Sequence, residues 1–521
     1  MATFLDNVQP PCSVEKQVVL CLCYPFLQGR GSAASRTCAE HEAANMEKTY
    51  LAVDLGAESG RAILGRLQDG KLSTEEVHRF PNQAETSSGR LRWNLPALMK
   101  EVHEGIRRAG ERNGGRLDGI AVDSWGVDYG LLDENGELIE NPVHYRDEGH
   151  AGEVDRFTRE LSREELFSMT GVQLLDFNTL FQLTAQRRLA PETLERARRL
   201  LHIGDLVAYL LGARPVSELT IASTSQLLGT GDRTWNLELA ARAGLPTGIF
   251  GELVEPATVT GELRPDAVLE TGLAEACPII AAASHDTAAA VASCPATEPG
   301  NWAYLSSGTW SLLGIETTAP VLSLEALASG FTNEAGACGS NRFLSIITGL
   351  WLVQECRRQW SEEGREADYE ELARMAEEAP PARAFIDPDN PLFASPGDMP
   401  GRVEEACLAS SQPVPGTRGE ILRCIIESLA RKYASVVRAA SGFAPGSIER
   451  LHVIGGGSRN VLLNRLTARE LGIPLVAGPV EATAKGNILL QAMATGEISN
   501  LGELRQVSAA STELVHFNPA D

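Results

Sequence analysis

Short apolar runs alternate with longer amphipathic segments from residue 48 to the end of the chain. The runs are bounded by Gly, Ser and Asp, whereas the segments repeat apolar positions with a helical spacing. We predict strands at 51–54, 62–67, 120–122, 130–133, 279–283 and 451–454, and helices at 96–110 and 420–441. Residues 162–212 are predicted to be mainly helical, with the clearest helical period at 195–212. Strands that alternate with helices predict an α/β fold.

Two predicted hairpins enclose turns of small residues. In the first, YLAVDLGAESGRAILGRL, Asp54 ends an apolar strand directly before residues 56–60. The second, WAYLSSGTWSLLGI, covers 302–315, and its Gly308 lies 252 residues after Gly56, about half of the chain. This spacing favours two related domains that each offer a turn to a shared cleft. A chance similarity of two glycine-containing hairpins is the alternative.

These turns and a third glycine-rich segment are candidate nucleotide contacts. Turns of small residues expose backbone N–H groups that hold phosphate oxygens. An acid such as Asp54 before the turn can hold Mg²⁺, although it could equally cap an ordinary hairpin. Hydroxyls and N–H groups of 306–309 would contact another part of the triphosphate. The glycines of HVIGGGSRN, 452–460, would let an adenosine lie against the backbone, or would form a tight strand-to-helix turn.

The segment ASHDTAAAVA, 283–292, is the candidate for proton transfer. Asp286 would be a general base that takes a proton from a hydroxyl as the oxygen attacks a γ-phosphate. His285 beside it would hydrogen-bond the substrate. In the alternative interpretation, Asp286 or Thr287 only caps the helix that follows, and His285 is structural.

Length, charge and cysteine usage narrow the class of protein. A chain of 521 residues is too long for one ordinary core, so we expect at least two domains. The formal net charge of −23 argues against nucleic acid and anionic membranes as partners. The ten cysteines include no CxxC pair and no HExxH occurs, so a structural zinc site is not indicated. Sparse cysteines in a long chain predict a cytoplasmic protein.

Several long strings resemble the FGGY carbohydrate kinases, which have the actin-like ATPase (ribonuclease H-like) fold. The strings are DLGAESGR (54–61), DSWGVDYGLLD (123–133), NTLFQL (178–183), ASHDTAAAV (283–291), YLSSGTWSLLG (304–314), GLWLVQ (349–354) and GPVEATAKGN (478–487). The resemblance covers residues 48–518. It implies an N-terminal domain over 48–292 with the sugar site and first hairpin, and a C-terminal, nucleotide-binding domain over 293–521. Residues 1–47 are predicted to be a disordered extension.

The resemblance also implies site residues. It implies ATP contacts from the two turns, from GLWLVQ and from the glycine-rich segment: Ala57, Glu58, Ser59, Gly60, Arg61, Thr309, Gln354, Gly456 and Gly457. It implies that Gly126, His285, Asp286 and Thr287 hold a ketose, with Asp286 as the proton acceptor. We add Asp123, which could bind sugar hydroxyls or fix its own loop, and Asp54 as the Mg²⁺ ligand. Glu58 replaces a frequent serine, so we expect it to point away from phosphate or to assist the metal.

We therefore predict an ATP-dependent ketose kinase that converts L-rhamnulose to L-rhamnulose 1-phosphate, with ATP and Mg²⁺ as cofactors. Ser345 and Ile346 stand where the family commonly has Lys-Asn, and that Asn is credited with a substrate contact. A related deoxyketose such as L-fuculose is therefore the alternative substrate. A non-kinase alternative is an actin-like ATPase that acts as a chaperone, filament or regulator. We expect a monomer or small homo-oligomer that binds neither nucleic acid nor membrane.

Overall fold

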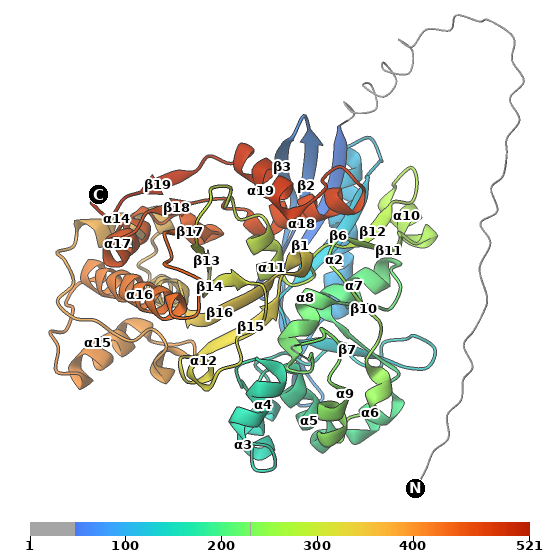
Figure 1. The fold of residues 1–521 in the computed structure, drawn as a ribbon, viewed down its shortest axis with the longest axis horizontal. Coiled ribbons are helices and arrows are strands. Elements are labelled where there is room, and N and C mark those ends of the chain that lie inside the picture. Colours follow the sequence, from blue (N-terminus) through green and yellow to red (C-terminus); the bar gives the residue numbers. More distant parts are fainter. Residues whose placement is uncertain (1–46, 230, 521) are drawn as a thin grey trace, which may run out of the picture. The chain divides into compact units, whose positions relative to one another are not determined.

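The computed structural model describes residues 47–229 and 231–520. All but Glu47 of the predicted N-terminal extension lies outside the described residues. Strands and helices alternate along the described chain, which confirms the predicted α/β class (Figure 1). Within these ranges, no helix combines the length and the apolar character that a membrane crossing needs.

A six-stranded sheet organises the N-terminal half of the described chain, in the order β11-β12-β6-β1-β2-β3. The strands are β1 (Lys48–Leu55), β2 (Ser59–Gln68), β3 (Lys71–Pro81), β6 (Gly119–Ser124), β11 (Thr258–Glu262) and β12 (Pro278–Ala281). β1 pairs antiparallel with β2 and parallel with β6. The predicted hairpin is thus confirmed. Because β1 and β6 are parallel, their C-terminal ends reach the same sheet edge, together with the acids Asp54 and Asp123.

A seven-stranded sheet repeats this arrangement in the C-terminal half, in the order β15-β16-β14-β13-β17-β18-β19. The strands are β13 (Trp302–Ser307), β14 (Trp310–Thr317), β15 (Phe331–Ala335), β16 (Asn341–Thr348), β17 (Arg450–Ile454), β18 (Leu475–Ala477) and β19 (Val515–Phe517). β13 pairs antiparallel with β14 and parallel with β17. The hairpin with a parallel third strand therefore occurs in both halves, as the spacing of the two glycine turns predicts.

Helices cover the sheets, and two of the predicted ones end within two residues of their expected bounds. They are α2 (Leu95–Arg112), which begins after the cap Asn94, and α16 (Arg418–Ser441), which begins with a capping box of Thr417 and Glu420. The other α-helices of the described residues are α3 (Glu153–Phe157), α4 (Arg163–Thr170), α5 (Thr179–Leu189), α6 (Pro191–Arg196), α7 (Ile203–Leu211), α8 (Leu219–Ala222), α9 (Leu237–Arg242), α10 (Pro265–Thr271), α11 (Asp286–Ala292), α12 (Leu324–Ala328), α13 (Trp351–Glu362), α14 (Tyr369–Glu378), α15 (Met399–Ala409), α17 (Val461–Leu471), α18 (Ala482–Ala494) and α19 (Leu501–Ala510).

The continuous helical period predicted over 195–212 is wrong. A strand, β8 (Arg199–His202), separates α6 from α7 and pairs antiparallel with β7 (Tyr129–Leu132). Leu200 and Leu201 are both buried. An apolar pair satisfies a helical and a strand period equally, and the pairing partner that decides between them lies about 70 residues earlier in the sequence.

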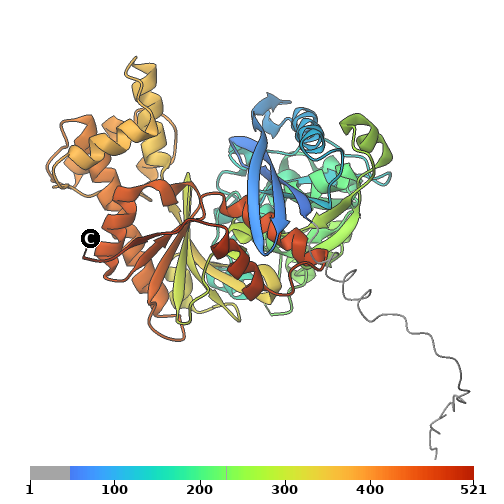
Figure 2. The same ribbon diagram turned by 90° about the horizontal axis from the view of Figure 1, so that it is seen from above.

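Two helices, α11 and α18, join the halves. α18 belongs to the C-terminal half of the sequence but packs on α11 and on the N-terminal strands β1 and β6, and Figure 2 shows it in red beside the blue strands. A Cβ added to Gly486 of α18 would lie 1.8 Å from the Ala289 carbonyl oxygen of α11. The small residues of both helices therefore allow the close crossing. This crossing fixes Asp286, the first residue of α11, where the two halves meet.

Candidate active site

The first hairpin carries an ion-pair cluster next to its turn. Arg61 of β2 forms ion pairs with Asp54 of β1 and with Glu481, the residue before α18. Glu58 lies in the turn with an exposed side chain. Sequence reasoning assigned Arg61 to ATP phosphates, whereas in this structure its guanidinium contacts two carboxylates, one from each half of the chain. The motif GPVEATAKGN contains Glu481, but no signal in the sequence pairs this residue with Arg61.

Asp123 lies opposite Asp54 in the parallel register and is fully buried. Its Oδ2 accepts a hydrogen bond of 2.6 Å from Asn487 Nδ2 of α18, while its Oδ1 has no partner among the described residues. Burial, followed by the nearby carboxylates of Asp54 and Asp286, raises the pKa of Asp123 well above its usual value, and the Asn487 amide opposes this rise. The carboxylates of Asp54, Asp123 and Asp286 thus lie near one another at the C-terminal ends of β1 and β6.

Buried polar groups hydrogen-bond Ser284, in the segment that carries Asp286. The Ser284 N–H donates to Glu218 Oε2 at 2.9 Å, and the Ser284 carbonyl accepts from the Ser124 N–H of β6 at 2.9 Å. The Ser284 hydroxyl donates to Asp205 Oδ1 at 2.9 Å. Glu218 and Asp205 are both buried. They were not predicted, and no motif in the sequence marks them.

Asp286 itself is the least buried acid of the group, with 32% of its side chain exposed. Its Oδ1 accepts hydrogen bonds from the N–H and the hydroxyl of Thr287. Removal from water raises the pKa of Asp286, and the Asp54 carboxylate raises it further, while His285 lowers it. A carboxylate that is accessible, oriented and of raised pKa is suited to accept a proton.

The DSWGVD loop supplies the predicted sugar contact Gly126 and a residue that prediction missed. A Cβ on Gly126 would lie 2.9 Å from Thr224 side-chain atoms, so packing alone requires glycine there. Val127 follows with φ of 68°, a strained conformation for a β-branched residue that recurs at functional sites. The missed residue is Asp128: its buried carboxylate accepts hydrogen bonds from Trp93, Trp125, Gln182 and the Tyr145 N–H. Four donors make it the anchor of the loop.

The second hairpin and the glycine-rich segment lie against each other. A Cβ on Gly457 would lie 1.9 Å from the Ser307 hydroxyl oxygen, whereas a Cβ on Gly456 would meet nothing within 4 Å. Thr309, in the hairpin turn, accepts the Trp351 N–H of α13 at its carbonyl at 3.1 Å. On the same helix, the buried Gln354 Oε1 has no partner among the described residues. Unfilled space at Gly456 and an unpaired acceptor at Gln354 fit a ligand with donor groups, such as adenosine.

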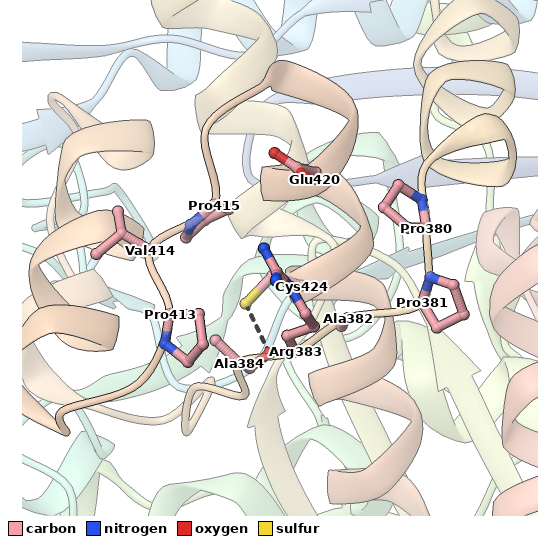
Figure 3. Close-up of a pocket in the computed structure, with 10 residues that line it drawn as sticks. All are labelled: Pro380, Pro381, Ala382, Arg383, Ala384, Pro413, Val414, Pro415, Glu420 and Cys424. Atoms are coloured by element: carbon pink, nitrogen blue, oxygen red, sulfur yellow. Dashed lines mark hydrogen bonds between the residues drawn. The ribbon is translucent and has the colours of Figure 1, made fainter.

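A cation–π contact also connects the two halves. The Arg146 guanidinium carbon lies 5.3 Å from the centre of the Trp351 ring and 5.5 Å from that of Tyr145. The sequence alone gave no indication of this contact. Away from the hairpins, a pocket lies between residues 380–384, residues 413–415 and α16. Four of its ten lining residues are prolines, and it contains none of the predicted site residues (Figure 3).

Each half thus carries a hairpin-bearing sheet, with acids near the strand ends of the first sheet and a glycine-rich segment after β17 of the second. Solved structures agree on the fold. Ligand-bound xylulose kinase from Lactobacillus acidophilus superposes with a TM-score of 0.75 at 16% identity and covers 91% of this chain and 94% of that one. Glycerol kinase from Plasmodium falciparum with ADP gives a TM-score of 0.72 at 14% identity over 90% and 94%.

Sequence comparisons identify the family. Residues 49–292 match the N-terminal domain of the FGGY family of carbohydrate kinases, and residues 303–495 match its C-terminal domain. A rhamnulokinase of Bacteroides thetaiotaomicron is 44% identical over 91% of this chain and 97% of its own length, and one of Enterococcus faecalis is 41% identical over 91% and 95%. The chain therefore belongs to the FGGY family of carbohydrate kinases. The predicted resemblance is confirmed, and the non-kinase alternative has no support.

Proposed function

We propose that the protein phosphorylates L-rhamnulose with ATP and forms L-rhamnulose 1-phosphate and ADP. The name rhamnulokinase of relatives at 36–44% identity over 91% of the chain supports this substrate. The observation that carries the chemistry is the position of Asp286, an accessible carboxylate at the start of α11 where the two halves of the chain meet.

Asp286 acts as the general base. As the sugar O1 attacks the γ-phosphorus, the O1–P bond forms, the bond from phosphorus to the bridging oxygen of ADP breaks, and the O1 proton passes to Asp286. Gly126, His285 and Thr287 hold the ketose around this carboxylate. Closure of the halves excludes water, so that the sugar hydroxyl and not water attacks.

The nucleotide lies between the two hairpins. Residues 57–61 and Thr309 face the phosphates, while Gln354, Gly456 and Gly457 contact the nucleoside. The carboxylate of Asp54 suits Mg²⁺, which prefers oxygen ligands. Among the described residues, no cluster of three or more His, Cys, Asp or Glu side chains forms a complete metal site. Phosphate and water would thus supply the other ligands, and the ion would neutralise charge on the phosphates.

These roles also suggest which domain binds which substrate, and in which compartment the protein acts. We propose that residues 48–292 bind sugar and that residues 293–521 bind nucleotide. We further propose a cytoplasmic monomer or small homo-oligomer, since ATP is a cytoplasmic substrate and the six cysteines from Cys277 to Cys424 are free thiols.

L-fuculose is the second candidate substrate because of Ile346. This residue lies on β16, is partly buried, and packs against the cluster that contains Ala290 and Val291 of α11. The apolar side chain of Ile346, packed near the helix that carries Asp286, cannot donate to the sugar the hydrogen bond that an asparagine would donate. It is therefore the first position to test for sugar preference.

The test is ADP release with Mg·ATP and a panel of L-rhamnulose, L-fuculose, L-xylulose, D-xylulose and glycerol, for the parent protein and Asp286→Asn. We expect L-rhamnulose to give the highest kcat/KM, and the variant to lose turnover by about 10²–10⁴-fold while it still binds ATP. A different preferred sugar, restored to L-rhamnulose by Ile346→Asn, would correct the substrate. A variant as active as the parent would rule out the base.

A further inference from the structure

A buried charged cluster lies directly behind Asp286. His285, the neighbouring residue, contacts Glu334 of β15 and Arg342 of β16, two residues of the C-terminal sheet. Arg342 is fully buried, and the other two side chains are no more than 8% exposed. The Arg342 Nη2 lies 2.8 Å from Glu334 Oε2 and 3.0 Å from His285 Nδ1. The C-terminal half thus reaches the residue next to the base.

Arg342 determines which nitrogen of His285 carries a proton. A guanidinium has only donors, so in the 3.0 Å contact with Arg342 the His285 Nδ1 is the acceptor and carries no hydrogen, whereas its contact with Glu334 Oε2 is longer, at 3.3 Å. The imidazole is then neutral with its hydrogen on Nε2. Burial raises the pKa of Glu334, but the Arg342 charge outweighs this and keeps that pKa at about 2. The Glu334 carboxylate is therefore ionised, and it holds the guanidinium in place.

The other ring nitrogen of His285, Nε2, lies near the base. His285 Nε2 lies 3.4 Å from Asp286 Oδ1, the same oxygen that accepts from the Thr287 N–H and hydroxyl. Among residues 47–229 and 231–520, each hydrogen bond to this carboxylate ends on Oδ1. Oδ2 is left to receive the proton of the sugar.

We propose that Arg342, supported by Glu334, is a positioning residue that fixes His285 as the Nε2–H tautomer, so that Asp286 Oδ1 faces a donor and Oδ2 serves as the basic oxygen. The inference rests on the proposed role of Asp286 as general base. It also makes the orientation of the base depend on the C-terminal sheet, and hence on how the two halves meet.

The expected defect is specific because removal of Arg342 frees His285 Nδ1. In Arg342→Gln, Nδ1–H would turn its hydrogen bond to Glu334, 3.3 Å away, and an Nε2 lone pair would face Asp286 Oδ1. Protonation of His285 would restore the Nε2–H. Other titratable or charged groups also face this region. They are Asp54 of β1, Asp123 of β6, Arg61 of β2, His202 of β8, Asp205 of α7 and Glu218, the residue before α8. They are unchanged in the variant, so a new titration belongs to His285.

The experiment measures kcat, both KM values and the pH profile of kcat for Arg342→Gln and Arg342→Lys. For Arg342→Gln we expect kcat to fall about tenfold to a hundredfold with KM for ATP unchanged. We also expect a new decline of kcat between about pH 6 and 8, where histidine ordinarily loses its proton. Lysine still donates to Nδ1, so Arg342→Lys should recover most of kcat without that decline. A parental profile for Arg342→Gln would overturn the proposal.

Two controls keep the outcomes separate. Arg505→Gln breaks another largely buried ion pair of the C-terminal half, with Glu316, and should leave the pH profile unchanged. Where Arg342→Gln does not fold, Glu334→Gln is the second variant: Arg342 still donates to Nδ1, so the new decline should be absent, and its presence would overturn the assignment. If Asp286→Asn keeps full turnover, the base itself is wrong. If only that variant loses turnover, the base stands and the role of Arg342 is rejected.

Discussion

The two hairpins share a backbone arrangement and differ in chemistry. Each pairs antiparallel within a sheet and runs parallel to a third strand, β6 in the first case and β17 in the second. The first strand pair ends in Asp54 and Asp123, with Asp286 close by. In the corresponding register of the second sheet, Ser306 lies opposite Ile454.

This difference indicates that the two hairpins contribute to different parts of the reaction. The acidic edge suits a cation and proton transfer, whereas the hydroxyl- and glycine-rich edge suits phosphate and nucleoside, which accept hydrogen bonds and need space. A duplicated fold can therefore serve one reaction, because the residues at the strand ends can diverge while the buried strands keep the frame.

Among the variants that compare the two hairpins, loss of the acid at the first hairpin should have the largest effect on kcat. Asp54→Asn removes a charge beside the proposed metal position, and we expect kcat to fall by about 10²–10³-fold, with more Mg²⁺ needed for half-maximal turnover. Steady-state ADP release across a Mg²⁺ titration measures both. Asp118→Asn is the matched control, since Asp118 pairs with Lys48 near the start of β1. If kcat of Asp54→Asn stayed within twofold of the parental kcat, the proposed difference in role between the two hairpins would be contradicted.

The second hairpin should respond through nucleotide binding. In Gly457→Ala the new methyl group would overlap Ser307, so we expect a loss of about 1–3 kcal/mol in unfolding free energy and a higher KM for ATP. Gly456→Ala has space for its methyl group and should keep the parental stability while raising that KM. Urea unfolding and ATP saturation curves separate the two. The double variant Gly457→Ala/Ser307→Gly should regain stability, and its failure to do so would refute the clash.

The contact between the halves should matter less. Arg146→Gln removes the cation–π contact with Trp351, which is worth about 0.5–2 kcal/mol, so kcat/KM should fall by at most about 30-fold. Trp351→Phe keeps an aromatic face, so its kcat/KM should fall less than that of Arg146→Gln. Equal losses in the two variants would argue against a cation–π contribution.

The smallest effect on turnover is expected for Asp123, whose influence is on stability. The raised pKa means that the folded protein binds this proton more tightly than the unfolded chain does. The associated stability is fully present below pH 3.8 and is lost as pH rises through the folded pKa. Asp123→Asn should remove this loss, which unfolding at a series of pH values would measure. An unchanged pH dependence would mean that Asp123 is ionised in both states.

The stability that Glu334 contributes should depend on pH in the opposite direction. Its pKa of about 2 lies below the ordinary 4.5, so the stability it contributes is present above 4.5 and is lost as pH falls towards 2. In Glu334→Gln this component of acid unfolding should disappear, a result measurable in the same pH series.

The sequence by itself determined the α/β class, both hairpins, α2, α16 and the family, because apolar periodicity, turn residues and long motifs are local signals. It also placed Asp54 and the glycine turns at the ends of their strands, and Asp286 at the start of its helix. Only the tertiary structure decided that β8 interrupts a helical period, that Arg61 pairs with Glu481, and that Arg342 and Glu334 lie behind His285. Each of these depends on a partner far along the chain. A buried charge needs such a partner to offset its loss of water, and the residues around it in the sequence do not reveal which one it has.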